Sequence, residues 1–228
     1  MPYDVVTAVR DFDADVVVVV ESWRTPDGRG MLDDLESFGY RIESVSLSTL
    51  AISPRRARHA EPGEGHVEIA ICSRLPILRR KELPLGLVPH DPYGPRSALL
   101  CTIDVDGTEV DVVGVHTSSM LWRLAPLRHL RALRPQLPTP ERAVVVAGDC
   151  NFWGPGVVAV LPGWRRAVLG RSWPAHRPHS QIDHILVRDN VTALSGEVLA
   201  ATPSDHRPVR ARLRVAPVPN PGGAGTVG

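Results

Sequence analysis

Ionisable side chains in the second half of the chain lie at the ends of apolar runs. Gly148-Asp149-Cys150-Asn151 closes one run, Gln181-Ile182-Asp183-His184 opens another, and Ser204-Asp205-His206 precedes a third. Strand ends of this kind can hold polar side chains rigidly around one cleft. Carboxylates suit a divalent cation and a water nucleophile, and histidines can move protons and neutralise a phosphate. These residue types predict metal-dependent phosphoester hydrolysis.

Two earlier apolar runs end in the same way. Glu21 closes Val16–Val20, and a carboxylate at the end of a buried strand is costly unless it is paired or bound to a metal. We therefore expect Glu21 to bind a metal; the alternative is a solvated strand end. His116 closes Val110–Val115 and can donate to a phosphate oxygen, although a lone histidine at a strand end is more often structural.

Spacing suggests a role for each residue of the later motifs. Asp149 and Asn151 are two residues apart, so in an extended segment both side chains point into one cleft. There Asp149 can orient or deprotonate a water, and Asn151 can bind a phosphate oxygen or the metal. Neighbours in a strand point apart, so we expect Asp183, rather than Asp205, to orient His206. Asp205 is then left for the metal. The alternatives are an ordinary Gly-Asp-Cys-Asn turn and an Asp-His surface turn.

Length and composition predict one domain, which we place at residues 1–215, with a disordered Pro/Gly tail at residues 216–228. Hydrophobic residues make up 43% of the chain, and its 22 prolines argue against long helices. We expect two packed sheets with helices outside them. The net charge of +1 provides no overall field that would attract nucleic acid, and we expect a monomer.

Hydrophobic periodicity locates the expected elements. Residues 3–13 and Met31–Phe38 are expected to be helical, Asp15–Val20 a fully buried strand, and Asp106-Gly107 the turn of a hairpin. A helix over Leu121–Leu133 is interrupted by Pro126, residues 154–180 are mostly loop, and Pro54–Gly65 is a mobile loop. The other expected strands are Arg41–Ile52 (one or two strands), His66–Ser73, Ile77–Leu83, Ala98–Val105, Glu109–Val115, Arg142–Ala147, Ile182–Val187, Val191–Leu199 and Val209–Val215.

Cysteine usage and the N-terminus suggest a compartment. Cys72, Cys101 and Cys150 are an odd number without metal-type pair spacing, which favours buried free thiols in a reducing environment. The first residues lack the pattern of a signal peptide, and Val16–Val20 is too short to cross a bilayer. We expect a cytoplasmic protein without a transmembrane segment.

Taken together and in order, these motifs resemble the endonuclease/exonuclease/phosphatase superfamily, which includes DNase I-like nucleases. The resemblance covers roughly residues 5–214 and rests on Val20-Glu21, Ile71 to Ile77, Val115-His116-Thr117, Gly148 to Asn151, Ile182 to Ile185 and Ser204 to Val209. It implies an α/β fold, a four-layer α/β/β/α sandwich of two mixed sheets.

The resemblance also implies phosphoester hydrolysis that depends on Mg²⁺ or Mn²⁺. By position, Glu21 binds the metal with support from Asp205, and Asp149 orients the water. Asn151 and His116 contact the phosphate. His206, paired with Asp183, faces the phosphate as a general base or electrostatic stabiliser.

The chain departs from the family at its start. Family members usually begin with a strand that carries an Asn near the metal, whereas this chain starts at the following helix, so the first strand is apparently missing. That departure supports an alternative function, a catalytically inactive binding or scaffold protein of the same fold.

The substrate is open between nucleic acid, a nucleotide, a lipid head group and a sugar phosphate. We expect Arg96 to contact it, because arginine suits bidentate phosphate binding. Trp153, Trp164 and Trp173 either stack on bases or touch lipid, or else pack the loops. A row of arginines at helical spacing either contacts phosphates or forms a solvated helix face (Arg123, Arg128, Arg131 and Arg134). A transition-metal site is a weaker hypothesis (His176, His179, His184 and His206).

Overall fold

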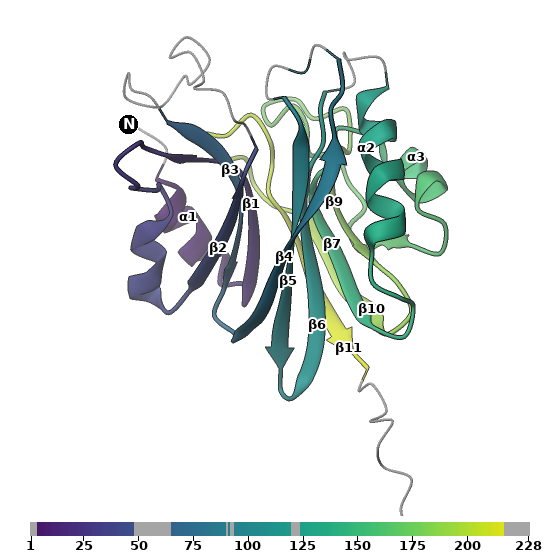
Figure 1. The fold of residues 1–228 in the computed structure, drawn as a ribbon, viewed down its shortest axis with the longest axis horizontal. Helices are drawn as coiled ribbons and strands as arrows, with labels where there is room; N and C mark the ends of the chain where they lie inside the picture. The colour runs from purple at the N-terminus through teal and green to yellow at the C-terminus, as the bar shows by residue number, and fades with distance from the viewer. Residues whose placement is uncertain (1–3, 48–64, 90, 92–93, 120–123, 217–228) are drawn as a thin grey trace, which may run out of the picture.

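Apolar side chains pack into three clusters that separate four layers. The computed structural model describes residues 4–47, 65–89, 91, 94–119 and 124–216. One cluster lies between helix α1 and a smaller sheet, one between the two sheets, and one between the larger sheet and helices α2 and α3. Figure 1 shows α1 outside the smaller sheet and α2 and α3 outside the larger one. The predicted α/β/β/α sandwich is confirmed.

The larger sheet has six strands in the order β4-β5-β6-β7-β9-β8. It is mixed, because β6 and β7 are parallel while the other neighbours are antiparallel. The strand bounds are β4 Ile77–Gly86, β5 Arg96–Val105, β6 Thr108–His116, β7 Ala143–Asp149, β8 Arg165–Arg166 and β9 Asp183–Val187.

The facing layer is in two parts. A three-stranded antiparallel sheet has the order β1-β3-β2, and a separate antiparallel ribbon pairs β10 with β11. The bounds are β1 Val16–Arg24, β2 Arg41–Ser46, β3 His66–Ser73, β10 Val191–Val198 and β11 Val209–Val215. The predicted strands are thus present, and the part predicted within residues 48–52 lies outside the described residues.

The β1 strand is less buried than its sequence predicts. Val16–Val20 was expected to be fully buried, yet each of these five valines is only half-buried. The reason is position: β1 is the edge of its sheet, and the side away from β3 carries no strand among the described residues. The expectation of a fully buried strand was wrong for this reason.

The helices are short, as the proline content predicts. Helix α1 (Val5–Phe12) begins at Asp4, whose side chain accepts from the Thr7 amide at 3.0 Å. The predicted helix before Gly39 is a 3₁₀ helix, η1 (Asp33–Phe38). Helix α2 (Ala125–Leu133) carries proline in its first turn, and a short 3₁₀ turn, η2 (Arg134–Gln136), follows it.

One helix was missed. Helix α3 (Gly154–Val160) lies in the segment that was predicted to be mostly loop. Its opening glycines and proline hid the helix, although proline is well tolerated in a first helical turn.

The predicted turn between β5 and β6 is present, with positive φ at both Asp106 (51°) and Gly107 (83°). None of the helices in the described part of the chain is long and apolar enough to span a membrane. The expected mobile loop (residues 54–64 of it) and all but residue 216 of the expected tail lie outside the described residues.

Candidate active site

The ends of three neighbouring strands bring the site together. In the parallel pair of β6 and β7, His116 lies opposite Asp149, and in the antiparallel pair of β7 and β9, Asp149 lies opposite Asp183. The larger sheet therefore brings together, at one end of its strands, the last residues of β6 and β7 and the first residue of β9. His206 joins them from the loop before β11. The clustering expected from the motifs is found in the structure.

Asp149 is the buried carboxylate at the centre of this group, with only 4% of its surface exposed. Its Oδ1 accepts from the Asn151 amide nitrogen at 2.7 Å, and its Oδ2 accepts from Asn151 Nδ2 at 3.0 Å. Burial raises the pKa of Asp149 to about 8, and the negative charge of Asp183 adds to this. The site thus contains a carboxyl group that titrates near neutral pH.

Asn151 fixes the Asp149 carboxylate in place. Its backbone is in the left-handed region (φ 45°), which asparagine tolerates better than most residues. The second proton of its amide is donated to the Thr117 carbonyl at 3.0 Å. Both protons of Nδ2 are therefore engaged, and the phosphate contact predicted for Asn151 requires one of these hydrogen bonds to be given up.

Asp183 and His206 form a close pair. His206 Nδ1 lies 2.9 Å and 3.1 Å from the two carboxylate oxygens of Asp183. Burial alone would lower the pKa of His206, but the hydrogen bond to Asp183 and the charges of Asp183, Asp149 and Asp205 outweigh it and raise the pKa to about 9. His206 is therefore an imidazolium at neutral pH. The prediction that Asp183, rather than the adjacent Asp205, orients His206 agrees with this geometry.

His116 is buried beside Asp149 and Glu21. Its Nε2 lies 3.7 Å from Asp149 Oδ2 and 3.9 Å from Glu21 Oε1. The pKa of His116 lies well below its ordinary value because burial disfavours the imidazolium and because Arg96 carries a positive charge nearby. Its Nδ1 is a buried atom with no hydrogen-bond partner among the described residues. His116 is neutral at physiological pH and can offer either a donor or an acceptor.

Arg96 lies behind His116. It is 3% exposed, forms a bidentate ion pair with Asp91 (2.8 Å and 3.2 Å) and donates to the His116 carbonyl at 3.3 Å. Ser118 donates to the same Asp91 carboxylate. The contacts shown here hold the end of β6 in place; the substrate contact that we expected of Arg96 stays a prediction.

Two small residues lock the ends of β6 and β7 together, and neither was given a role from the sequence. Thr117 donates its hydroxyl to the Cys150 carbonyl at 2.5 Å, and its amide donates to the Asp149 carbonyl at 3.0 Å. Gly148 has φ 135°, and a Cβ there would lie 2.1 Å from the Val115 carbonyl oxygen. Only glycine fits this crossing. The sequence offered one indication of these roles, namely the glycine directly before Asp149 and the threonine hydroxyl directly after His116.

Ser172 is a further positioning residue that was missed. It is fully buried, and its Oγ accepts from the Asp183 amide at 3.3 Å and from the Ile182 amide at 3.4 Å. The start of β9 is therefore held by a loop about ten residues earlier. Nothing in the local sequence pattern around Ser172 indicates this contact.

The strongest candidate ligand group is not the pair predicted to bind metal. Asp149, Asp183 and His206 each offer one ligand atom, and these atoms lie within 4.8 Å of one another. Glu21, in the left-handed conformation (φ 58°) at an irregularity in β1, has a side chain that is 55% exposed and lies near His116. Asp205 is exposed and acts on His206 through its charge. Metal binding by Glu21 and Asp205 remains a prediction.

The remaining candidate residues lie apart from this cluster. Trp153 is 56% exposed at the start of α3, whereas Trp164 is buried in the apolar cluster beneath α2 and α3. His184 is buried, and its Nε2 lies 2.9 Å from the Phe152 carbonyl oxygen. It is not part of the ligand group of Asp149, Asp183 and His206 found among the described residues, and the transition-metal site stays a hypothesis. Arg128, Arg131 and Arg134 lie along and just after α2, as a solvated face would, and Arg123 lies outside the described residues.

Comparison with solved structures shows the same fold. An endonuclease/exonuclease/phosphatase from Beutenbergia cavernae DSM 12333 is 20% identical with a TM-score of 0.72, over 94% of this chain and 66% of that one. A mannosyl-6-phosphatase from Bacteroides thetaiotaomicron VPI-5482 is 16% identical with a TM-score of 0.71, over 92% and 89%. D. rerio TDP2, complexed with a single-strand DNA product, is 15% identical with a TM-score of 0.67, over 92% and 90%. At these identities the likeness concerns the fold alone.

Sequence comparison identifies the family. No curated protein is significantly similar to the chain. A family model described as the Endonuclease/Exonuclease/phosphatase family matches residues 3–206, which is most of the chain, and members of that family are generally phosphoester hydrolases. The chain therefore belongs to the endonuclease/exonuclease/phosphatase family.

Proposed function

We propose that the protein is a phosphoester hydrolase that depends on Mg²⁺ or Mn²⁺ and cleaves its substrate with an activated water. The observation that carries the proposal is the arrangement of a buried carboxylate, Asp149, beside the Asp183–His206 ion pair and the neutral His116. A proton acceptor (Asp149), a cationic stabiliser (His206) and a neutral donor (His116) thus lie together at one end of the strands of the larger sheet. Family membership supports the same class of reaction.

A divalent cation fits these residues. Two aspartates lie opposite each other at adjacent strand ends, and their mutual repulsion contributes to the raised pKa of Asp149. A cation offsets that repulsion, and carboxylate oxygens are the ligands that Mg²⁺ prefers. Asp149 and Asp183 would hold it from the larger sheet, with Glu21 and Asp205 as the predicted ligands from the opposite side. When bound, it would neutralise phosphate charge and lower the pKa of a nearby water.

The chain's own residues supply the proton movements. Asp149 takes a proton from the water whose oxygen forms the new bond to phosphorus, and its buried position between His116 and Asp183 places it for this role as general base. Asp183 occupies Nδ1 of His206 and leaves Nε2 of the imidazolium to donate to a phosphoryl oxygen as charge develops. The bond from phosphorus to the leaving oxygen breaks, that oxygen takes a proton from solvent water, and Asp149 returns the proton that it accepted to solvent. His116 Nε2, 3.7 Å from Asp149, can contact the same phosphate.

The test is turnover of bis-p-nitrophenyl phosphate and p-nitrophenyl phosphate with EDTA, Mg²⁺ or Mn²⁺. Asp149→Ala should lower kcat/KM by about 10³-fold, the usual contribution of a general base. Asp34→Ala, which removes an exposed carboxylate on the 3₁₀ helix η1, is the matched control and should leave turnover unchanged. Metal-dependent turnover that survives Asp149→Ala would refute the mechanism.

A small phosphoester is favoured over DNA as the substrate, because the net charge of +1 provides no overall field that would attract a polyanion. The structurally similar proteins include both a mannosyl-6-phosphatase and a protein complexed with a single-strand DNA product. The ratio of diester to monoester turnover in the same assay separates these classes. A preference for single-stranded DNA over both small esters would contradict this choice.

The alternative is a non-catalytic binding protein of the same fold. A wide cavity that runs from β1 and β11 into the site favours it, because an open site admits water and weakens electrostatic stabilisation. It predicts that Mg²⁺ and Mn²⁺ leave the thermal unfolding temperature unchanged and that neither ester is hydrolysed.

A further inference from the structure

Helix α3 lies in an outer layer of the molecule, yet its sequence is entirely apolar. From Phe152 to Trp164 the thirteen residues contain no charged side chain, hydroxyl or carboxamide. A surface helix normally places charged or polar residues on the face that points away from the core. The buried face of α3 consists of Gly154, Gly156 and Val157. Its outward face is therefore apolar as well, and apolar surface of this kind marks an interaction site.

The outward face of α3 is open to solvent. Pro155 and Ala159 are exposed, and Trp153, directly before the helix, is 56% exposed. A Cβ on Gly156 would lie 3.0 Å from Trp153 Nε1, so the indole lies against the first turn of the helix. The ring extends the apolar face, and its N–H suits a boundary where one side is apolar and the other is wet.

Helix α2 packs beside α3 and adds positive charge (Figure 1). Leu124, Arg128 and Arg131 are exposed and follow one another at helical spacing along α2, and the exposed Arg134 begins η2. In the described part of the chain, none of these three arginines forms a hydrogen bond or an ion pair. Their donors are thus available to an external partner.

A further arginine lies on the other side of α3. Helix α2 contacts β4, at one edge of the larger sheet, whereas α3 contacts β8 at the opposite edge. Arg166 of β8 reaches the start of α3, because a Cβ on Gly154 would clash with its guanidinium. The same guanidinium donates to Gln181 Oε1 at 2.9 Å. The apolar face of α3 therefore has cationic side chains on both sides.

Charge is divided between the two outer faces of the molecule. Residues 124–182, which include α2, η2, α3 and β8, contain eight arginines and two acidic residues, a net charge of +6. Residues 4–46, which form α1, β1, η1 and β2, contain four arginines and ten acidic residues, a net charge of −6. Figure 1 shows α1 and the α2–α3 pair on opposite sides. An anionic surface would therefore attract the molecule with α2 and α3 foremost.

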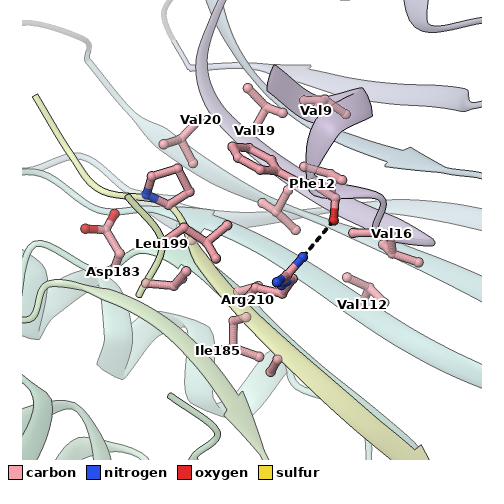
Figure 2. A pocket seen from close by; sticks show the side chains of 18 of the residues that line it. Val9, Phe12, Val16, Val19, Val20, Val112, Asp183, Ile185, Leu199 and Arg210 are labelled. Carbon is pink, nitrogen blue, oxygen red and sulfur yellow. Dashed lines mark hydrogen bonds between the residues drawn. The ribbon is translucent and has the colours of Figure 1, made fainter. Parts of the chain in front are cut away.

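Two arginines of the facing layer show the contrast with α2. Arg210 of β11 donates from Nη1 to the Phe12 carbonyl at 3.1 Å and pairs with Glu197 at 2.9 Å (Figure 2). Arg24 of β1 pairs with the buried Glu68 at 3.0 Å. These arginines hold the protein's own elements together, which the arginines of α2 do not.

We propose that the outer face of α2 and α3 docks on an anionic lipid bilayer. Trp153 and Ala159 enter the region between head groups and acyl chains, and Arg128 and Arg131 bind lipid phosphates. A nucleic acid would pair with the arginines but would leave the apolar helix uncovered. A second copy in a two-fold contact would place like charges against each other. Docking needs no metal and is separate from hydrolysis, so it goes beyond the proposed function.

The charge of the surface is tested by flotation with vesicles of phosphatidylcholine, alone or with about 30% phosphatidylserine, in EDTA. Partition should be at least about tenfold stronger into the anionic vesicles, and about 0.5 M salt should weaken it by a similar factor. Arg128→Gln/Arg131→Gln should weaken it about 20-fold, since each arginine near the membrane contributes about fivefold. Arg212→Gln/Arg214→Gln removes equal charge from exposed positions of β11 and should change it by less than about twofold.

The apolar face is tested by Ala159→Glu against Ala159→Gln. Both residues are good helix formers at an exposed position, so both variants should keep the unfolding temperature of the unmodified protein. Only glutamate places a charge in the membrane surface, and it should weaken partition by at least about tenfold more than glutamine does.

Several outcomes would overturn the proposal. The first is equal partition into the two kinds of vesicle, and the second is an equal loss in the two double arginine variants. Binding of a single-stranded oligonucleotide without binding of vesicles would assign the surface to nucleic acid. A concentration-dependent dimer that Ala159→Glu dissociates, again without binding of vesicles, would assign it to a second copy of the chain. Because every readout is made without turnover, failure of the proposed hydrolysis would leave this test intact.

Discussion

Replacement of Asp183 by asparagine probes the electrostatics of the site most directly. In the folded protein the Asp183 hydrogen bond and charge do most to raise the pKa of His206 to about 9 against the effect of burial. The displacement from 6.5 to about 9 corresponds to about 3 kcal/mol, at about 1.4 kcal/mol for each pKa unit. The asparagine side chain keeps the shape but removes the charge, so the pKa of His206 should fall to 6.5 or below.

The same shift makes folding stability depend on pH. Because the folded-state pKa of His206 lies above the unfolded value, the ion pair contributes fully below about pH 6.5. That contribution is lost as the pH rises through about 9. In Asp183→Asn the part of this loss that comes from His206, between about pH 6.5 and 9, should be absent. The total effect is at most about 3 kcal/mol in the free energy of unfolding.

The assay is NMR titration of the His206 ring in EDTA, combined with urea unfolding at about pH 6, 7.5 and 9.5, which brackets the transition. Asp205→Asn is the matched control, since Asp205 is exposed and its charge contributes least among the acidic neighbours. It should lower the pKa of His206 far less than Asp183→Asn does. A His206 pKa that stays near 9 in Asp183→Asn, or that is already near 6.5 in the unmodified protein, would refute the reasoning.

Three further predictions concern other parts of the site. His129 of α2 is buried, and its Nδ1 accepts from the Ser118 amide at 3.3 Å. Burial lowers the pKa of His129 to about 4, so the free energy of unfolding should fall by up to about 3 kcal/mol as the pH drops from 6.5 to 4, and urea unfolding should show that His129→Leu removes this part of the acid sensitivity. Gly148→Ala should lower the free energy of unfolding by about 2–4 kcal/mol because its Cβ meets the Val115 carbonyl, whereas Gly107→Ala, with open space around it, should lower it by about 1 kcal/mol. Equal decreases for the two variants in chemical unfolding would contradict the close approach at Gly148. In calorimetry, saturating Mg²⁺ should raise the unfolding temperature by about 5–10 °C in the unmodified protein but not in Asp149→Asn. An equal rise in the unfolding temperature of Asp149→Asn would exclude Asp149 as a ligand.

Local patterns predicted the elements that carry the site. Val144–Ala147 could only be a buried strand, and the polar group directly after it had to lie at that strand's end. The pairing of Asp183 with His206 followed from the alternation of side chains along a strand. The strand and the exclusion of Asp205 need only neighbouring residues, which is why the sequence was sufficient for them. Asp183 lies 23 residues from His206 and was chosen as another carboxylate of the same set of motifs.

Contacts between distant segments could not be predicted in this way. The partner of Arg96 is Asp91 in a Pro/Gly-rich loop, and its second contact, the His116 carbonyl, is twenty residues away. Burial of Val16–Val20 depends on whether a strand lies beyond the edge of β1, which the valines themselves do not encode. Helix α3 was hidden because its glycines and proline are also typical of loops.

The β5–β6 hairpin gives this molecule a place to accept foreign sequence. Its tip, Asp106-Gly107, lies at the opposite end of β6 from His116, and nine residues of strand place the two roughly 30 Å apart. An exposed turn of this kind tolerates insertions well. A fluorophore or affinity peptide inserted there would report on the protein while leaving the strand ends that carry the candidate site untouched.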